Sequence, residues 1–209
     1  MLASPGKPDR PVLEWAASLD RMRQLHPAYL VGSHSRPLAG SAAIDEALAN
    51  YARAIRFVHD ETVKRVNAGE PLYQIRQEVR LPADLAAQPY LQPVYGTVEW
   101  AVNGVFRQYT GWYDFDPAHL NGGDPATTAR ALTEAAGGAD AVLRRARAAA
   151  EQGQLQLALE LAEAAGDSAA AHRLRAEVLE RMATQTGNGV ARNIYREAAA
   201  AERKGEGAK

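Results

Sequence analysis

The sequence contains no cysteine, and this absence removes several kinds of site at once. A chain of 209 residues without cysteine has no disulfide, no thiolate ligand for a metal and no cysteine nucleophile. An excess of charge is also lacking, since 24 Lys and Arg residues stand against 25 Asp and Glu residues. Such a balance gives no electrostatic basis for binding nucleic acid or an anionic membrane.

Long hydrophobic runs are missing too. No apolar segment approaches the roughly 20 residues that a membrane-spanning helix needs, so we expect no membrane span. The first residues, MLASPGKPDRP, lack the apolar stretch of a secretory signal, which leaves the localisation unknown and cytoplasmic by default. Hydrophobic residues make up 46% of the sequence, and many of them are Ala rather than β-branched. This composition favours a mainly α-helical fold.

Large side chains are concentrated in one stretch, residues 94–120. It holds two of the chain's three Trp residues and two of its three Phe residues. Apolar residues recur there at helical spacing, and Gly111 follows where the helix should end. Because aromatic side chains bury the most area per residue, we expect the core to form around this helix, with Trp100 and Trp112 both buried.

Apolar periodicity and Gly or Pro breaks outline the other elements. Helices are predicted at 12–25, at 41–68 with Ser41 as N-cap, and at 71–79. Tyr29-Leu30-Val31 is typical of a short buried strand, although no partner strand is visible elsewhere. After a break at 121–125, glycines separate five further predicted helices: 126–136, 139–152, 154–165, 168–185 and 188–203. Within them, AAAEQGQLQLALELAEAAG resembles half of a tetratricopeptide repeat (TPR).

The aromatic stretch resembles the dimerisation domain of the zinc-dependent alkyl sulfatases, which belong to the metallo-β-lactamase superfamily. YGTVEW, then GWYDFDP and His-Leu, is similar to that family's YGTxxW, an Arg, and GWFDGNP. Asn103 stands near the position of that Arg, while Tyr113, Phe115 and Asp116 replace Phe, Gly and Asn. FVHDET in the long helix and RNIY near the C-terminus match further family segments, so the resemblance covers about residues 11–200.

The loop SHSRP carries the only site residues that the resemblance implies. It resembles the last piece of a metallo-β-lactamase fold, in which a His ligates one of two zinc ions. The resemblance gives this role to His34 and leaves Arg36 to face the anionic sulfate, since a guanidinium suits a planar set of acceptor oxygens. The residues alone favour the other interpretation, that His34 is a loop residue without a ligand, because a zinc site needs about three or four protein ligands.

The motif H-x-H-x-D-H, the main ligand set of that superfamily, is absent, and the five His residues are isolated. We therefore expect no catalytic residue and no cofactor in this chain alone, the two zinc ions belonging to the full-length family. The run His59-Asp60-Glu61 consists of residue types that can bind a ligand or take part in catalysis. Successive helix positions point in different directions, so these three cannot converge on one ligand, and we interpret them as a solvated face or structural polar contacts.

The resemblance implies a division into four parts. Residues 1–40 would be a C-terminal remnant of a metallo-β-lactamase-like domain, and residues 41–120 the helical dimerisation domain. TPR-like helical hairpins would follow at 121–203, and a disordered tail at 204–209. Two predicted helices, the one at 41–68 and the one in the aromatic stretch, have more apolar surface than one thin helical layer can cover. This excess predicts a homodimer.

Two functions remain open on the sequence alone. The first is the dimerisation module of an alkyl sulfatase-like zinc hydrolase, a sulfuric ester hydrolase, encoded as the C-terminal part of a larger or split enzyme. Such a module is not catalytic by itself, and a separately encoded catalytic domain is a candidate partner. The alternative is a stand-alone protein-interaction or scaffold protein that reuses the dimerisation domain.

Overall fold

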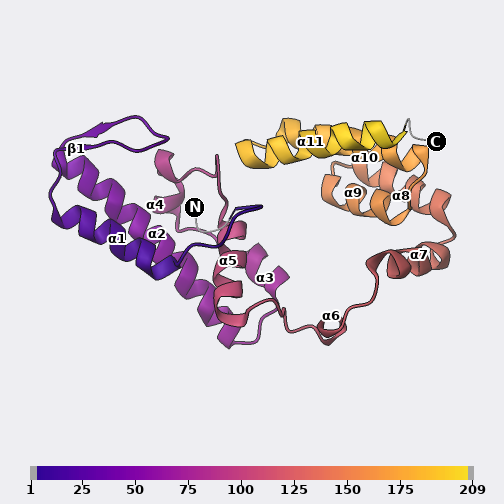
Figure 1. Ribbon diagram of the computed structural model, residues 1–209, viewed down its shortest axis with the longest axis horizontal. Helices are drawn as coiled ribbons and strands as arrows, with labels where there is room; N and C mark the ends of the chain where they lie inside the picture. The colour runs from indigo at the N-terminus through magenta and orange to yellow at the C-terminus, as the bar shows by residue number, and fades with distance from the viewer. Residues whose placement is uncertain (1–3, 207–209) are drawn as a thin grey trace. The chain divides into compact units, whose positions relative to one another are not determined.

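The structure, a computed structural model, describes residues 4–206 and is mainly α-helical, as predicted. The chain divides after Leu120 into two compact units. In Figure 1 the N-terminal unit runs from indigo to magenta, and the C-terminal unit from salmon to yellow. Among the described helices, none is both long and apolar enough to cross a lipid bilayer.

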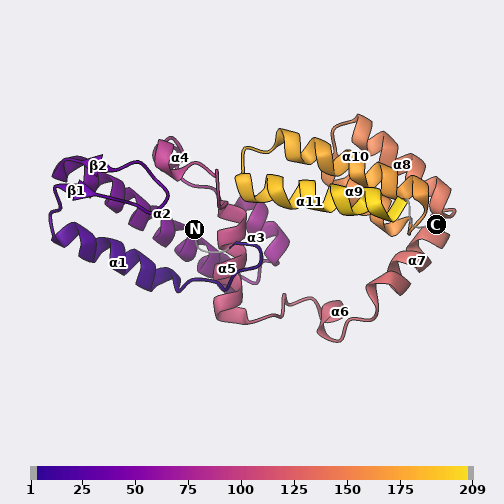
Figure 2. The same ribbon diagram turned by 45° about the horizontal axis from the view of Figure 1, so that its top comes forward.

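The N-terminal unit is built on two helices that lie side by side, α1 (Val12–Gln24) and the long α2 (Ser41–Asn67). A third main helix, α5 (Val98–Thr110), packs against α2 and the short α3 (Figures 1 and 2). The remaining elements are α3 (Leu72–Glu78), α4 (Ala83–Ala86), a 3₁₀ turn (Pro89–Leu91) and α6 (Pro117–Leu120).

A small β-hairpin stands between α1 and α2. Its strands β1 (Tyr29–Leu30) and β2 (Leu38–Ala39) are antiparallel, with Tyr29 opposite Ala39 (Figure 2). The expectation of a strand without a partner was therefore wrong, and so was its burial, because Tyr29 is exposed. Two residues such as Leu38-Ala39 are too short to show the alternation that marks a strand in a sequence.

The helix α5 supplies the centre of the core of this unit. Val102, Val105 and Phe106 are fully buried, and Phe106 is 1% exposed. They share one apolar cluster with residues of α1, α2 and α3: Val12, Ala16, Leu19, Ile44, Leu48, Ala52, Ile55, Val58 and Ile75. Because α1 contributes to the same cluster, the residues expected to form the remnant 1–40 pack into one body with the long helix.

The two tryptophans of the aromatic stretch are not both buried, which corrects the sequence prediction. Trp112 is 72% exposed, and Trp100 is only partly buried. Trp100 lies one position outside the stripe that faces the core. After Thr110 the helix ends at Gly111, whose φ of +71° turns the chain away, so Trp112 no longer follows the buried face.

The cap predicted for the long helix was wrong, and two other helices have caps that were not predicted. Ser41 is the first residue of α2 rather than its cap, because Gly40 makes the turn out of β2 with a φ of +96°. This conformation favours glycine, which has no β-carbon to clash. Thr97 caps α5 by accepting a hydrogen bond from the Trp100 backbone N–H at 3.1 Å. Asp124 caps the next long helix through the N–H groups of residues 126 and 127.

The C-terminal unit consists of helices joined by short Gly-containing turns: α7 (Pro125–Ala135), α8 (Ala139–Glu151), α9 (Leu155–Ala164), α10 (Ala169–Gln185) and α11 (Gly189–Glu206). Each lies within three residues of its predicted bounds. The helix α11 continues through Glu206, so residues 204–206 of the expected tail are helical, while residues 207–209 lie outside the described part.

Small side chains let these helices approach closely. Fully buried alanines of α8, α9 and α10 face one another in the apolar cluster: Ala146, Ala158, Ala162 and Ala171. In the sequence these alanines resembled the small packing positions of helical repeats. The pairs α8–α9 and α10–α11 each form a hairpin, and α9 joins the two pairs by packing on α10.

One buried charge ties three of these helices together. The side chain of Arg175 on α10 is 9% exposed. Its Nε donates to the Glu202 carboxylate of α11 at 2.8 Å, and its Nη1 donates to the carbonyls of Ala162 and Gly166 at 3.2 and 2.8 Å. His172 also lies 2.7 Å from Glu202. The guanidinium is thus satisfied by both neighbouring helices, as a buried charge requires.

The core position of Phe106 generates a stability prediction. Phe106→Ala should lower the free energy of unfolding by about 3–5 kcal/mol, since it removes a ring from a closed apolar cluster. Tyr73→Ala is the matched control, because Tyr73 on α3 is an exposed aromatic residue and its loss should cost about 0.5 kcal/mol or less. Urea unfolding followed by circular dichroism measures both values. Equal losses would contradict this placement of the core.

Candidate functional site

The two residues that the sequence singled out lie together in the hairpin loop. His34 and Arg36 belong to the segment of residues 31–37 that joins β1 and β2, and both side chains are exposed. Within residues 4–206, no three His, Cys, Asp or Glu side chains gather where they could hold a metal ion. The loop presents one imidazole and one guanidinium, which is too few groups for a zinc site.

Apolar side chains surround this hairpin without a cover inside its unit. Leu25 is 78% exposed, and Tyr29 and Val31 are exposed to a similar degree. We call these three residues the hairpin patch. Three exposed apolar residues so close together in the sequence make this part of the unit a candidate for contact with another protein.

A polar contact joins α2 to α5 beside the core. His59 is buried, its Nε2 lies 2.6 Å from the Tyr109 hydroxyl, and its Nδ1 lies 2.7 Å from the Asp60 carboxylate. The sequence pattern did not predict this meeting, because residues 59 and 109 are 50 positions apart. Glu61 pairs with Lys64 and Arg65 instead. The contact holds the end of α5 and orients the Tyr109 ring.

The last turn of α5 and the segment after it carry a group of aromatic rings, which we call the aromatic loop: Tyr109, Trp112, Tyr113 and Phe115. Ring centroids lie 5.8 Å apart for Trp112 and Tyr113 and 5.7 Å apart for Tyr113 and Phe115. The Phe115 ring also meets the buried Phe106 edge-on at 5.8 Å. The loop is therefore anchored to the core at one end, while Trp112 and Phe115 remain largely exposed.

Hydrogen bonds to charged side chains stabilise the backbone conformation of the aromatic loop. The Asp114 carboxylate accepts a hydrogen bond from the Asp116 backbone N–H at 3.1 Å and lies 2.6 Å from His119 Nδ1. The hydrogen bond to His119 lowers the pKa of the Asp114 carboxyl, and the hydrogen bond to Asp114 raises the pKa of the imidazole. Phe115 adopts a φ of +69°, a left-handed conformation that is strained for a bulky residue.

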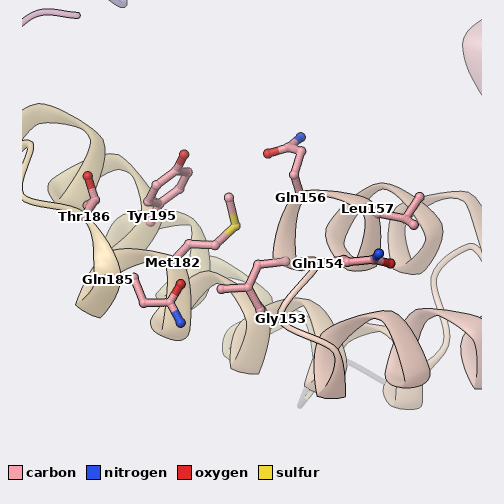
Figure 3. Close-up of a pocket in the computed structure, with 9 residues that line it drawn as sticks. Gly153, Gln154, Gln156, Leu157, Met182, Gln185, Thr186 and Tyr195 are labelled. Atoms are coloured by element: carbon pink, nitrogen blue, oxygen red, sulfur yellow. The ribbon is translucent and has the colours of Figure 1, made fainter. Parts of the chain in front are cut away.

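An open groove lies on the C-terminal unit, between the start of α9 and the C-terminal end of α10. Its volume is about 700 Å³. Figure 3 shows Gln156, Met182 and Tyr195 around this space, with Gln185 and Thr186 at one end. None of the lining residues carries a charge or a nucleophile activated by a base. The groove offers amide and hydroxyl groups beside apolar surface, which suits the binding of a partly apolar group.

Within residues 4–206, the helical fold and these exposed surfaces resemble a protein-association module. The family model for alkyl sulfatase dimerisation matches residues 72–205, a stretch that includes α5, the aromatic loop and the helical hairpins. The chain belongs to this alkyl sulfatase dimerisation family.

Three curated proteins show the same relationship. A linear primary-alkylsulfatase of Pseudomonas sp. (strain ATCC 19151) is 38% identical over 148 residues, which are 70% of this chain and 28% of that protein. An alkyl/aryl-sulfatase of Saccharomyces cerevisiae is 31% identical over 87% of this chain and 29% of its own length. An (R)-specific secondary-alkylsulfatase of Pseudomonas sp. is 31% identical over 93% of this chain and 31% of its own length.

A solved structure agrees with these sequence relationships. The stereoselective inverting sec-alkylsulfatase of Pseudomonas sp. matches with a TM-score of 0.92 and 30% sequence identity. The match covers 98% of this chain but 34% of that protein. The chain thus spans about a third of the length of the alkylsulfatases that it resembles.

The contact between His119 and Asp114 predicts a pH dependence. Because the folded pKa of His119 is raised above 6.5, the stabilisation of the loop is complete below pH 6.5 and is lost as the pH rises through the folded pKa. Asp114→Asn should lower the His119 pKa, as measured by NMR titration of the imidazole. Glu99→Gln, which removes a charge on α5 outside the loop, should leave that pKa unchanged; an equal effect of both variants would exclude a specific pair.

Proposed function

We propose that this chain is the dimerisation module of an alkyl sulfatase-like zinc hydrolase, and that it assembles as a homodimer. The match of the family model to residues 72–205 is the observation that carries the proposal. Exposed aromatic and aliphatic side chains on the N-terminal unit support it. When a partner covers such apolar groups and removes them from water, the free energy of the system falls.

We further propose that the hairpin loop belongs to a composite active site. A separate catalytic part carrying the metal motif would meet the loop, with His34 as one zinc ligand and Arg36 as a contact for the sulfate. Residues 1–40 would then be the piece of a metallo-β-lactamase-like domain carried by this chain. The exposure of both side chains supports this role, since they are free to meet a partner. Among the residues that the structure describes, no group of His, Asp and Glu side chains fits a zinc ion without such a partner.

A second candidate is a stand-alone interaction or scaffold protein that reuses the dimerisation domain. The uncharged groove of about 700 Å³ on the C-terminal unit favours it, since this groove could bind a partner without any catalytic part. The genomic neighbourhood separates the two candidates. A neighbouring reading frame that encodes H-x-H-x-D-H favours the sulfatase module, and a gene without such a neighbour favours the scaffold.

The homodimer is tested by sedimentation at micromolar concentration. The expected mass is twice the 22.5 kDa of one chain. Dissociation on dilution should be reversible and should not change the helical content, because each unit has its own apolar core. A monomer at every concentration would count decisively against the dimerisation module.

The composite site is tested by complementation. The purified chain alone should neither hydrolyse alkyl sulfates nor bind zinc stoichiometrically. Mixed with the catalytic part of a related alkylsulfatase, it should support metal-dependent turnover that His34→Ala and Arg36→Ala both abolish. His119→Ala is the matched control, since it removes an exposed imidazole outside the hairpin. Turnover by the chain alone, or turnover in the mixture that survives His34→Ala, would refute this assignment.

A further inference from the structure

We propose that the aromatic loop is the surface through which two copies of this chain meet. The inference rests on the proposed homodimer and names the residues that form it. Tyr109 and Phe115 are about half exposed, and Trp112 is 72% exposed, although aromatic rings are the side chains that gain most from burial. Phe115 connects the loop to the buried Phe106, so a partner that covers the loop would extend the core of the unit.

The order within the loop favours a preformed contact surface. Contacts between ring edges and faces hold Trp112, Tyr113 and Phe115 in fixed relation, and the hydrogen bond to His59 holds Tyr109. Rings that are already ordered lose little conformational freedom when a partner binds. Trp and Tyr are also the residues that most often carry the binding energy of protein interfaces.

The charge distribution fits a second copy of the same chain. The carboxylates of Asp114 and Asp116 are turned towards backbone N–H groups and His119, so the ring surface itself is uncharged. In a twofold dimer the same patch of both copies meets across the axis, so an unpaired charge close to the axis would lie near its own copy. An uncharged aromatic surface avoids this repulsion and is complementary to itself.

The family match separates this surface from the hairpin patch. The aromatic loop lies inside residues 72–205, which match the dimerisation family, whereas Leu25, Tyr29 and Val31 lie outside them. The hairpin patch is therefore left for a different partner. The four side chains, three of them exposed and Tyr113 partly buried, supply on the order of 400 Å², about half of the area that one partner contributes to a standard interface. Flanking residues must supply the rest.

The backbone of Phe115 gives independent support. A bulky residue at a φ of +69° carries a strain that glycine would avoid. Within the unit its ring recovers only partial burial, since it stays about half exposed beside Phe106 and Tyr113. Contact with a second copy would complete the burial of this ring.

The test measures self-association of the full chain by sedimentation across sub-micromolar to high micromolar concentrations. Trp112→Asp should raise the dimer dissociation constant by at least about 30-fold, as expected for a hot-spot residue that is replaced by a charge facing its twofold copy. Leu25→Asp is the matched control, because it places the same charge at an equally exposed residue of the hairpin patch. It should change the constant by less than about threefold.

The outcomes separate this inference from the homodimer itself. A wild-type chain that stays monomeric overturns both. A wild-type dimer whose dissociation constant is unchanged in folded Trp112→Asp overturns the interface alone. A dimer that dissociates in Leu25→Asp but not in Trp112→Asp would place the interface at the hairpin patch. That result would also overturn the proposed aromatic interface.

Fluorescence decides the case if Trp112→Asp fails to fold. The difference between the emission of the wild type and of Trp112→Phe reports on Trp112 alone. This emission should shift to shorter wavelength over the same concentrations at which the dimer forms. Emission of Trp112 that is the same in the monomer and in the dimer would mean that no second copy covers the loop.

Discussion

The burial of one face of α5 is the constraint on which the N-terminal unit depends. Val102, Val105 and Phe106 enter the space between α2 and α3, and each such side chain stabilises the fold by about 1.5–3 kcal/mol when fully buried. The same helix fixes the start of the aromatic loop and, through Tyr109, the contact with His59. A shift of α5 would therefore move the exposed rings as well as the core.

The sequence predicted the helices well because their signals are local. Apolar spacing over 10 or more residues and glycine at the turns placed α8 to α11 within three residues of their observed ends. Predictions that needed tertiary information failed. Trp112 follows α5 in the sequence, but the turn at Gly111 removes it from the buried face, and composition cannot show this. The partner strand β2 was missed because two residues carry no periodicity.

The candidate site was predictable only in part. The resemblance located His34 and Arg36, and the structure places both in one exposed hairpin loop, where their proposed roles depend on groups from another part. The meeting of His59 with Tyr109 joins residues 50 positions apart, so no local pattern could reveal it. The short spacing of Asp114, Asp116 and His119 did carry a signal, since carboxylates at loop positions often accept backbone N–H groups nearby.

The buried Arg175 has a consequence for how the C-terminal unit folds. Arrays of helical hairpins in which each pair contacts only its neighbours can fray from one end. Here the guanidinium leaves water only when Glu202 of α11 and the carbonyls at the end of α9 are all in place. When α11 is not docked, the guanidinium stays in contact with water and its ion pair with Glu202 is not formed. This single side chain therefore links three helices, because its contacts with α9 and α11 are complete only when the last turns of α11 are docked.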